Sequence, residues 1–177
     1  MMLSEALGRE IVVNGKYDAN NEASVKFINC EGKGNQSNGG AILANSLTIT
    51  NTNPNEKEKY GTSFIGCYAR RGGAALVTGK SMSIAGVSCL NCSCQTAGGV
   101  FYHENTDSDA ETSIMNCLFD KCFSNKDPKW SYGGAVNSKA SELSVNGCKF
   151  MDCYATSSGG AINHSPENTS SITKTEI

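Results

Sequence analysis

A pair of glycines followed by a short apolar segment recurs five times along this 177-residue chain. The pairs are Gly39-Gly40, Gly72-Gly73, Gly98-Gly99, Gly133-Gly134 and Gly159-Gly160. Their spacings of 33, 26, 35 and 26 residues fall in the range typical of proteins built from stacked repeats. The chain is therefore constrained to an architecture in which one short structural unit is repeated.

A second motif, an apolar residue followed three positions later by cysteine, precedes each glycine pair. The five sets cover residues 27–30, 64–67, 89–92, 119–122 and 150–153, and their first residue, called the lead residue below, is Phe in all but the third, which begins with Cys89. Short alternating apolar runs end five residues before the last three sets, at Ile84, Ile114 and Val145. Before the second set this distance, from Ile49 to Phe64, grows to fifteen residues. The added residues are mainly Asn, Pro, Glu and Lys and predict a surface loop.

Each repeat thus holds three apolar stretches of three to five residues, separated by Gly and Asn. Such stretches are too short for helices and are typical of strands. Glycine suits the corners between them, because positive φ costs it little. We therefore expect an all-β, right-handed parallel β-helix of about five coils with three short strands each, in which a bulky residue at Gly134 or Gly160 damages a corner. A leucine-rich repeat is the alternative, but its Leu and Asn spacing differs.

The domain organisation follows from the extent of the repeats. Residues 1–10 are expected to be an N-terminal segment or degenerate coil, with a helical turn from Ser4 to Arg9 as one option. Residues 11–177 form a single β-helix domain, with loop insertions near 51–61 and 124–131. The second insertion contains Trp130, which is expected to fold back on the coil. Because residues 172–177 begin what looks like another strand, we expect a fragment of a longer solenoid.

The nine cysteines are expected to be structural. Five of them recur at one position per repeat and are called the ladder cysteines: Cys30, Cys67, Cys92, Cys122 and Cys153. We expect them to be buried, in contact and mostly unbridged, because free cysteine packs as a small apolar residue. Cys117 and Cys148 fall on the same strand face as the lead Phe, and Cys89 replaces it. The run from Cys89 to Cys94 imitates a metal cluster, but no second ligand pair accompanies it, so no metal is expected.

Few residues qualify for catalysis. His103 and His164 share one position in their repeats with Ser138, and two coils of separation are too large for both to bind one metal. They are expected to be polar residues at strand ends. A carboxylate pair could still come from Asp107, Asp109 and Glu111, but three acids in a Ser/Asn/Thr-rich segment are typical of a solvated loop. We predict no enzyme, no catalytic residue and no cofactor.

Charge and hydropathy limit the partners. A net charge of −2 without a Lys/Arg cluster argues against nucleic acid. No apolar run approaches the twenty residues of a membrane-spanning helix, and residues 1–10 lack the apolar region of a signal peptide.

The repeats resemble those of chlamydial polymorphic outer membrane proteins, defined by Gly-Gly-Ala-(Ile/Leu/Val) and Phe-x-x-Asn tetrapeptides. The first motif matches well at Gly39, Gly133 and Gly159 and loosely at Gly72 and Gly98, whereas cysteine replaces the Asn of the second. That replacement makes the chain more similar to surface repeat proteins of parasitic protists. The resemblance covers roughly residues 11–172 and names no catalytic residue.

The resemblance implies a cell-surface or secreted, adhesin-like module that presents a binding surface to an extracellular protein or glycan. Two alternatives stay open. One is a fragment of a carbohydrate-active β-helix enzyme, a polysaccharide lyase or hydrolase with acids from its loops. The other is an intracellular repeat scaffold whose cysteines remain reduced.

Overall fold

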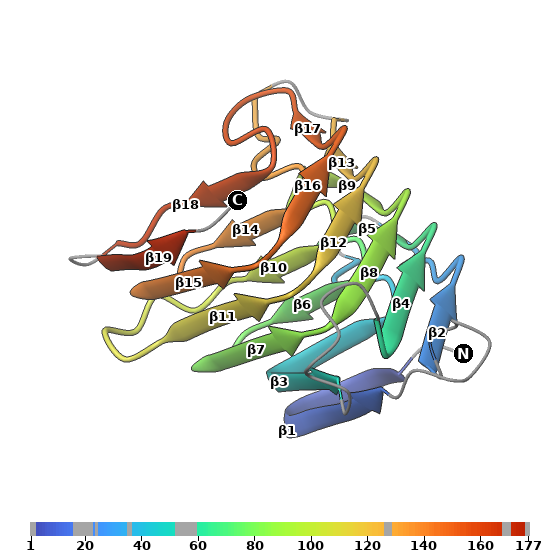
Figure 1. The fold of residues 1–177 in the computed structure, drawn as a ribbon, viewed down its shortest axis with the longest axis horizontal. Coiled ribbons are helices and arrows are strands. Elements are labelled where there is room, and N and C mark those ends of the chain that lie inside the picture. Colours follow the sequence, from blue (N-terminus) through green and yellow to red (C-terminus); the bar gives the residue numbers. More distant parts are fainter. Residues whose placement is uncertain are drawn as a thin grey trace.

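The computed structural model describes residues 3–15, 23, 25–34, 37–51, 60–125, 129–167 and 171–175. Within these ranges the chain is all-β and contains no helix, and therefore no helix that could cross a membrane. The strands form three sheets, of ten, five and four strands (Figure 1). Every pairing between them is parallel.

The strand bounds follow sheet by sheet. The ten-stranded sheet, called the large sheet, comprises β1 (Leu3–Gly15), β3 (Ile42–Asn51), β6 (Ala75–Val77), β7 (Ser81–Ala85), β10 (Phe101–His103), β11 (Glu111–Met115), β14 (Val136–Ser138), β15 (Glu142–Asn146), β18 (Ile162–His164) and β19 (Ser171–Thr175). The five-stranded sheet comprises β2 (Val25–Ile28), β4 (Thr62–Ile65), β8 (Val87–Leu90), β12 (Leu118–Asp120) and β16 (Lys149–Met151). The four-stranded sheet comprises β5 (Tyr68–Arg71), β9 (Ser93–Ala97), β13 (Phe123–Ser124) and β17 (Tyr154–Ala155).

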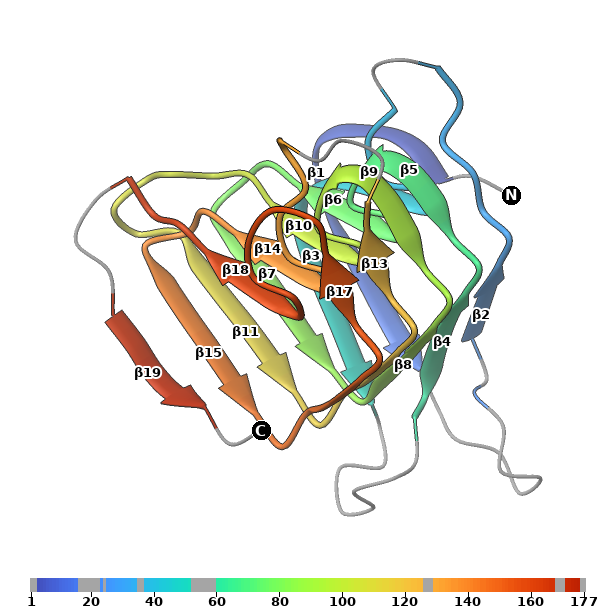
Figure 2. The ribbon, with the colours of Figure 1, turned by 90° about the horizontal axis from the view of Figure 1, so that it is seen from above.

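From β4 to β15, each strand pairs with the strand four places later in the chain. β6, β10, β14 and β18 are neighbours in the large sheet, as are β7, β11 and β15, while β8 pairs with β12 and β9 with β13. The long strand β3 serves both rows, because its first residues pair with β6 and its later ones with β7. Successive sets of four strands therefore lie beside one another in chain order, as the colour gradient in Figure 2 shows.

The strand registers align equivalent positions of the sequence repeats. The lead residues Phe27, Phe64, Cys89, Phe119 and Phe150 are direct partners along the five-stranded sheet. The second residues after the glycine pairs, from Ile42 to Ile162, are partners along the large sheet. We call such a row of aligned residues a column. The columns predicted from sequence are confirmed.

The prediction of three strands per repeat is wrong, because the complete sets contain four. The extra strands β5, β9, β13 and β17 follow the ladder cysteines. Their inward positions carry small residues, Ala69, Cys94 and Ser124, all of which are buried. A strand whose buried face carries no large apolar residue has no apolar signature in the sequence, so the apolar pattern does not predict this strand.

Two further corners of each repeat are formed by residues with positive φ. Gly86, Asn116 and Gly147 lie at the end of the second strand, and Asn29, Gly66, Asn91, Lys121 and Asp152 lie before the ladder cysteines. Gly, Asn and Asp adopt this left-handed conformation most readily, which explains why they recur there. Lys121 is the exception in this row.

The N-terminal segment is extended. β1 pairs with β3, with Glu10 to Gly15 in register with Ser46 to Asn51. The option of a helical turn from Ser4 to Arg9 is therefore wrong. β1 runs across position 10, and the boundary between residues 10 and 11 stays a prediction.

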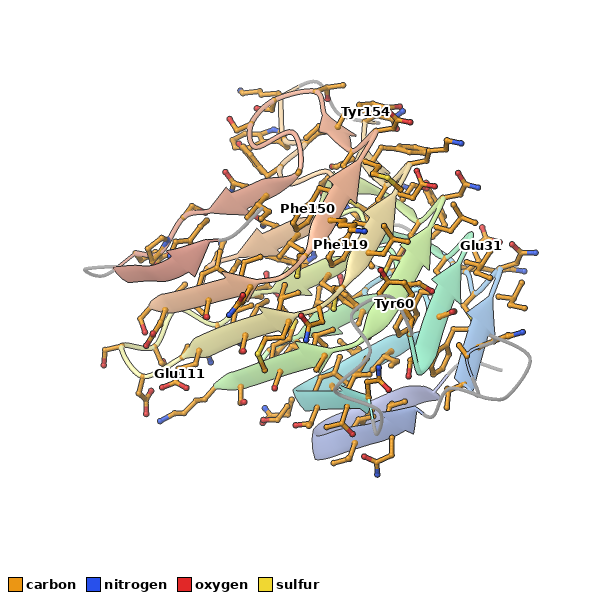
Figure 3. All side chains as sticks on the ribbon, viewed as in Figure 1. Glu31, Tyr60, Glu111, Phe119, Phe150 and Tyr154 are labelled. Atoms are coloured by element: carbon orange, nitrogen blue, oxygen red, sulfur yellow. The ribbon has the colours of Figure 1, made fainter. Side chains whose placement is uncertain are left out.

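One continuous apolar core lies between the sheets. The columns headed by Phe27 and Ile42 belong to the same cluster, as predicted. Phe119 and Phe150 stack face to face, with ring centroids 4.8 Å apart, and point between the sheets in Figure 3. Phe27 and Phe64 stack in the same way. Burial of these columns supplies the main favourable term of folding.

The smaller Cys89 interrupts the Phe column, and Phe101 occupies the space. The Phe101 ring lies edge-on to both Phe64 and Phe119, at centroid distances of 5.7 and 6.0 Å. Phe101 is fully buried, and its direct partners in the large sheet are the smaller Ala75 and Val136. A small residue in one column is thus matched by a large one in the other.

The predicted sensitivity of Gly160 to bulky substitution is not supported. A Cβ atom built at Gly160 would meet only the carbonyl oxygen of Cys153, at 3.8 Å, which is ordinary contact. The reason is position, because Gly160 belongs to the last pair and no described backbone stacks against it. The same atom at Gly134 would lie 2.0 Å from the Gly160 carbonyl oxygen, so the prediction for Gly134 is retained.

Candidate functional site

A buried polar chain links two neighbouring repeats of the large sheet. Ser138 is the direct partner of His103 on one side and of His164 on the other, as the sequence predicted. The imidazole Nδ1 of His103 lies 2.8 Å from the Thr112 hydroxyl, which lies 2.9 Å from the Ser138 hydroxyl. His103, Thr112 and Ser138 are all buried.

The hydrogen bonds assign the tautomer of His103. Its Nε2 lies 2.6 Å from the carbonyl oxygen of Gly79, which can only accept, so Nε2 carries the proton. Nδ1 then accepts from Thr112, which accepts from Ser138, and the Ser138 oxygen accepts the backbone N–H of Ala140. Every donor in the chain is used when the imidazole is neutral, and burial lowers the pKa of His103 below its usual value. His103 is thus a structural residue that faces the interior.

Lowering the pH below 6.5, the ordinary pKa of histidine, should destabilise the protein through His103. The unfolded chain binds a proton there while the folded chain does not, so this contribution to the free energy of unfolding is intact above pH 6.5. It is lost by up to about 1.4 kcal/mol per pH unit as the pH falls towards the lowered pKa of the folded state. Urea denaturation from pH 8 to 5 measures the slope. His103→Gln should have a shallower slope, and equal slopes would contradict the assignment.

Four of the five ladder cysteines are buried, and Cys153 is half-buried. None of them is bridged, as predicted. Each of the last four donates its thiol to the carbonyl oxygen of the lead residue in the preceding repeat, as when Cys67 donates to Phe27 at 3.5 Å and Cys92 donates to Phe64 at 3.5 Å. The thiols of Cys30 and Cys92 also lie within hydrogen-bonding reach of Cys67. The ladder therefore satisfies backbone carbonyls at a corner.

The remaining cysteines are also buried. Cys117 and Cys148 are direct neighbours on the core side, and Cys89 lies in the Phe column. The Cys117 thiol donates to the carbonyl oxygen of Met115 at 3.1 Å, and the Cys148 thiol lies within reach of the Asn146 and Ile114 carbonyl oxygens. Burial raises the pKa of the Cys89 thiol well above its usual value and that of Cys94 to about 11. The Cys89 and Cys94 thiols therefore stay neutral, whereas metal binding requires the thiolate. Among the described residues, no group of three or more His, Cys, Asp or Glu side chains could hold a metal ion.

The acids considered for catalysis lie on the surface. Asp107, Asp109 and Glu111 are all exposed, and Glu111 projects away from the sheets in Figure 3. Asp109 forms an ion pair with Lys80, with Nζ and Oδ2 2.6 Å apart. Lys80 lowers the pKa of Asp109, the opposite of what a general acid requires. The structure does not gather these acids into a cleft.

A groove of about 550 Å³ lies on the outer side of the large sheet. Its lining residues are Arg70, Thr96, Ala97, Tyr102, Trp130, Tyr132, Asn137, Lys139, Ser158, Asn163 and Ser165. Strand geometry explains this set, since successive residues of a strand point to opposite faces. Tyr102, Asn137 and Asn163 each follow a core residue and are direct partners on β10, β14 and β18.

A second column forms the side of the groove. Ala97, Tyr132 and Ser158 are joined by single parallel bridges. The indole of Trp130 stands beside Tyr132, with ring centroids 6.5 Å apart at 67°, and is 52% exposed. Lys129 lies over the indole, with Nζ 5.1 Å from its centroid. Trp130 thus lies among the residues that line the groove, while its predicted return onto the coil stays a prediction.

Tyr102 is held at the bottom of this groove. The Arg71 guanidinium lies over its ring, 5.7 Å from the centroid, and Arg71 forms an ion pair with Glu104. Burial, and then the negative charge of Glu104, raise the pKa of Tyr102 to about 12. Its phenol is therefore a neutral hydrogen-bonding group at physiological pH.

Sequence reasoning identified the column of Tyr102, Asn137 and Asn163 but not the groove. The spacing of these residues gives no sign of what lies beside them, and only the fold shows that Trp130 and Tyr132 flank them. The single Trp in a loop insertion was the one available signal. Lys139 and Ser165, which follow β14 and β18, carried no signal.

The chain matches no family model, no curated protein and no solved structure.

Proposed function

We propose that this chain is a right-handed parallel β-helix that serves as a non-catalytic binding module, adhesin-like and presented at the cell surface or secreted. The fold proposal is supported by the pairing of each strand with the strand four places later. A crossover between parallel strands of one sheet is right-handed in about 98% of cases, which supports the handedness.

The observation that carries the binding proposal is the groove over β10, β14 and β18. It combines two exposed or half-exposed aromatic rings with amides, hydroxyls and cations, the composition of a recognition site. Its partner is proposed to be an extracellular protein or glycan. None of the described residues lining it is acidic, so it offers no carboxylate for general acid–base catalysis.

The unbridged cysteines favour a second candidate, an intracellular repeat scaffold. All nine thiols are free, and free thiols are typical of reducing compartments. Most are buried, however, and a buried thiol that already donates to a carbonyl is protected from oxidation in either compartment.

Arrays of glycans and extracellular proteins test the binding module. The labelled chain should retain ligands that Trp130→Ala loses, because the exposed indole is the main apolar surface of the groove. Tyr154→Ala is the matched control, since Tyr154 is also exposed but lies on β17, outside the groove lining. Equal retention by wild type and Trp130→Ala would refute binding through the groove, and shortening of a bound polysaccharide would refute the non-catalytic part.

A further inference from the structure

We infer that the groove binds a linear glycan that carries carboxylate groups. This inference rests on the proposed binding function and specifies the ligand of the same site. The groove crosses β10, β14 and β18, which belong to successive repeats. Adjacent parallel strands lie about 4.8 Å apart, so equivalent side chains recur at that interval along the groove. A polymer laid across the strands would meet one residue of each column at every step: Tyr102, Asn137 or Asn163 in one column and Ala97, Tyr132 or Ser158 in the other.

The aromatic residues favour sugar rings. Trp130 is 52% exposed and Tyr132 is half-buried, and their planes are inclined at 67°. One face of a pyranose presents several C–H groups that pack on an aromatic ring, while the hydroxyls around its edge stay free to hydrogen-bond. A rigid indole provides this contact area with little loss of conformational entropy.

The amides supply hydrogen-bonding groups of both kinds. Asn163 donates from its side-chain nitrogen Nδ2 to the side-chain oxygen Oδ1 of Asn137, at 2.7 Å. This arrangement leaves the Asn137 nitrogen as a donor and the Asn163 oxygen as an acceptor. Sugar hydroxyls donate and accept at once, so a row of mixed donors and acceptors suits them.

The charges select a carboxylate. Arg70 and Lys139 line the groove and none of its described lining residues is acidic, although the whole chain has a net charge of −2. Lys139 forms no ion pair with any residue that the structure describes. A ligand carboxylate would form an ion pair with Lys139 at the edge of the groove. Attraction between these opposite charges would also speed association.

Calorimetric titration with three probes tests the inference. The probes are a uronic acid oligosaccharide, the same chain with its carboxyl groups reduced to alcohols, and a poly-glutamate peptide of equal charge. We expect the uronate to bind most tightly, with affinity falling as salt increases. Trp130→Ala should weaken both sugars about tenfold. Lys139→Gln should weaken the uronate about threefold to fivefold and leave the reduced chain unchanged.

Lys33→Gln is the control, because Lys33 is exposed and does not line the groove. It should leave all affinities unchanged. Circular dichroism melts of each variant establish that the fold is intact. Equal affinities for the uronate and its reduced form would show that the carboxylate plays no role. Equal affinities for poly-glutamate and the uronate would show that the groove does not select a glycan. If neither sugar binds while a protein on the array binds the wild type and not Trp130→Ala, the proposed binding function is retained and this inference is wrong.

Discussion

Gly134→Ala should destabilise the protein by about 3–5 kcal/mol, whereas Gly160→Ala should be nearly neutral. Both residues are the second glycine of a pair followed by alanine, and neither has positive φ. A Cβ at Gly134 would lie 2.0 Å from the Gly160 oxygen and 2.5 Å from the Tyr154 oxygen. Backbone atoms cannot rotate away as a side chain can, so two repeats would have to separate.

Urea denaturation followed by circular dichroism measures both variants. Gly99→Ala extends the comparison, because its Cβ would lie 1.8 Å from the Gly134 oxygen. The transition midpoint should fall sharply for Gly99→Ala and Gly134→Ala and stay near the wild-type value for Gly160→Ala. Equal effects at Gly134 and Gly160 would show that the glycines matter for chain flexibility and not for the close approach of repeats.

Phe101→Ala should cost about 3–5 kcal/mol, and adding Cys89→Phe should recover a substantial part of that loss. Phe101 fills the gap that Cys89 leaves between Phe64 and Phe119. Cys89→Phe alone overfills the core and should cost about 1–3 kcal/mol. In the double variant the new ring can stack on Phe64 and Phe119, as the other neighbouring Phe rings already do.

A double-mutant cycle measures this exchange of volume between the two columns. The double variant should be more stable than the sum of the single changes predicts, by about 2 kcal/mol or more. Phe123→Ala is the control, because Phe123 is half-buried and stacks on Tyr154 at the four-stranded sheet. It should add to either change independently. Additive effects of Cys89→Phe and Phe101→Ala would contradict the packing argument.

Much of the fold could be predicted because the same motifs recur in every repeat and can be aligned with one another. The lead residues and the glycine pairs recur at fixed positions, so the columns could be aligned by counting, and the registers match them. The fourth strand could not be predicted, because Ala69, Cys94 and Ser124 are too small to mark a buried face. The tolerance of Gly160 to a larger residue could not be predicted either. Its motif is like that of Gly134, and the two differ in whether described backbone of another repeat stacks against them.

The candidate site shows the same division. The order of residues along the chain determined which side chains share a column, including Tyr102, Asn137 and Asn163, because strand periodicity and repeat spacing are local properties. It also determined that the cysteines lie in the core. Only the tertiary structure decided that Trp130 and Tyr132 border that column and that Lys139 lies at its edge. Loop insertions have no periodicity, so where their side chains lie is set by contacts between residues far apart in the chain.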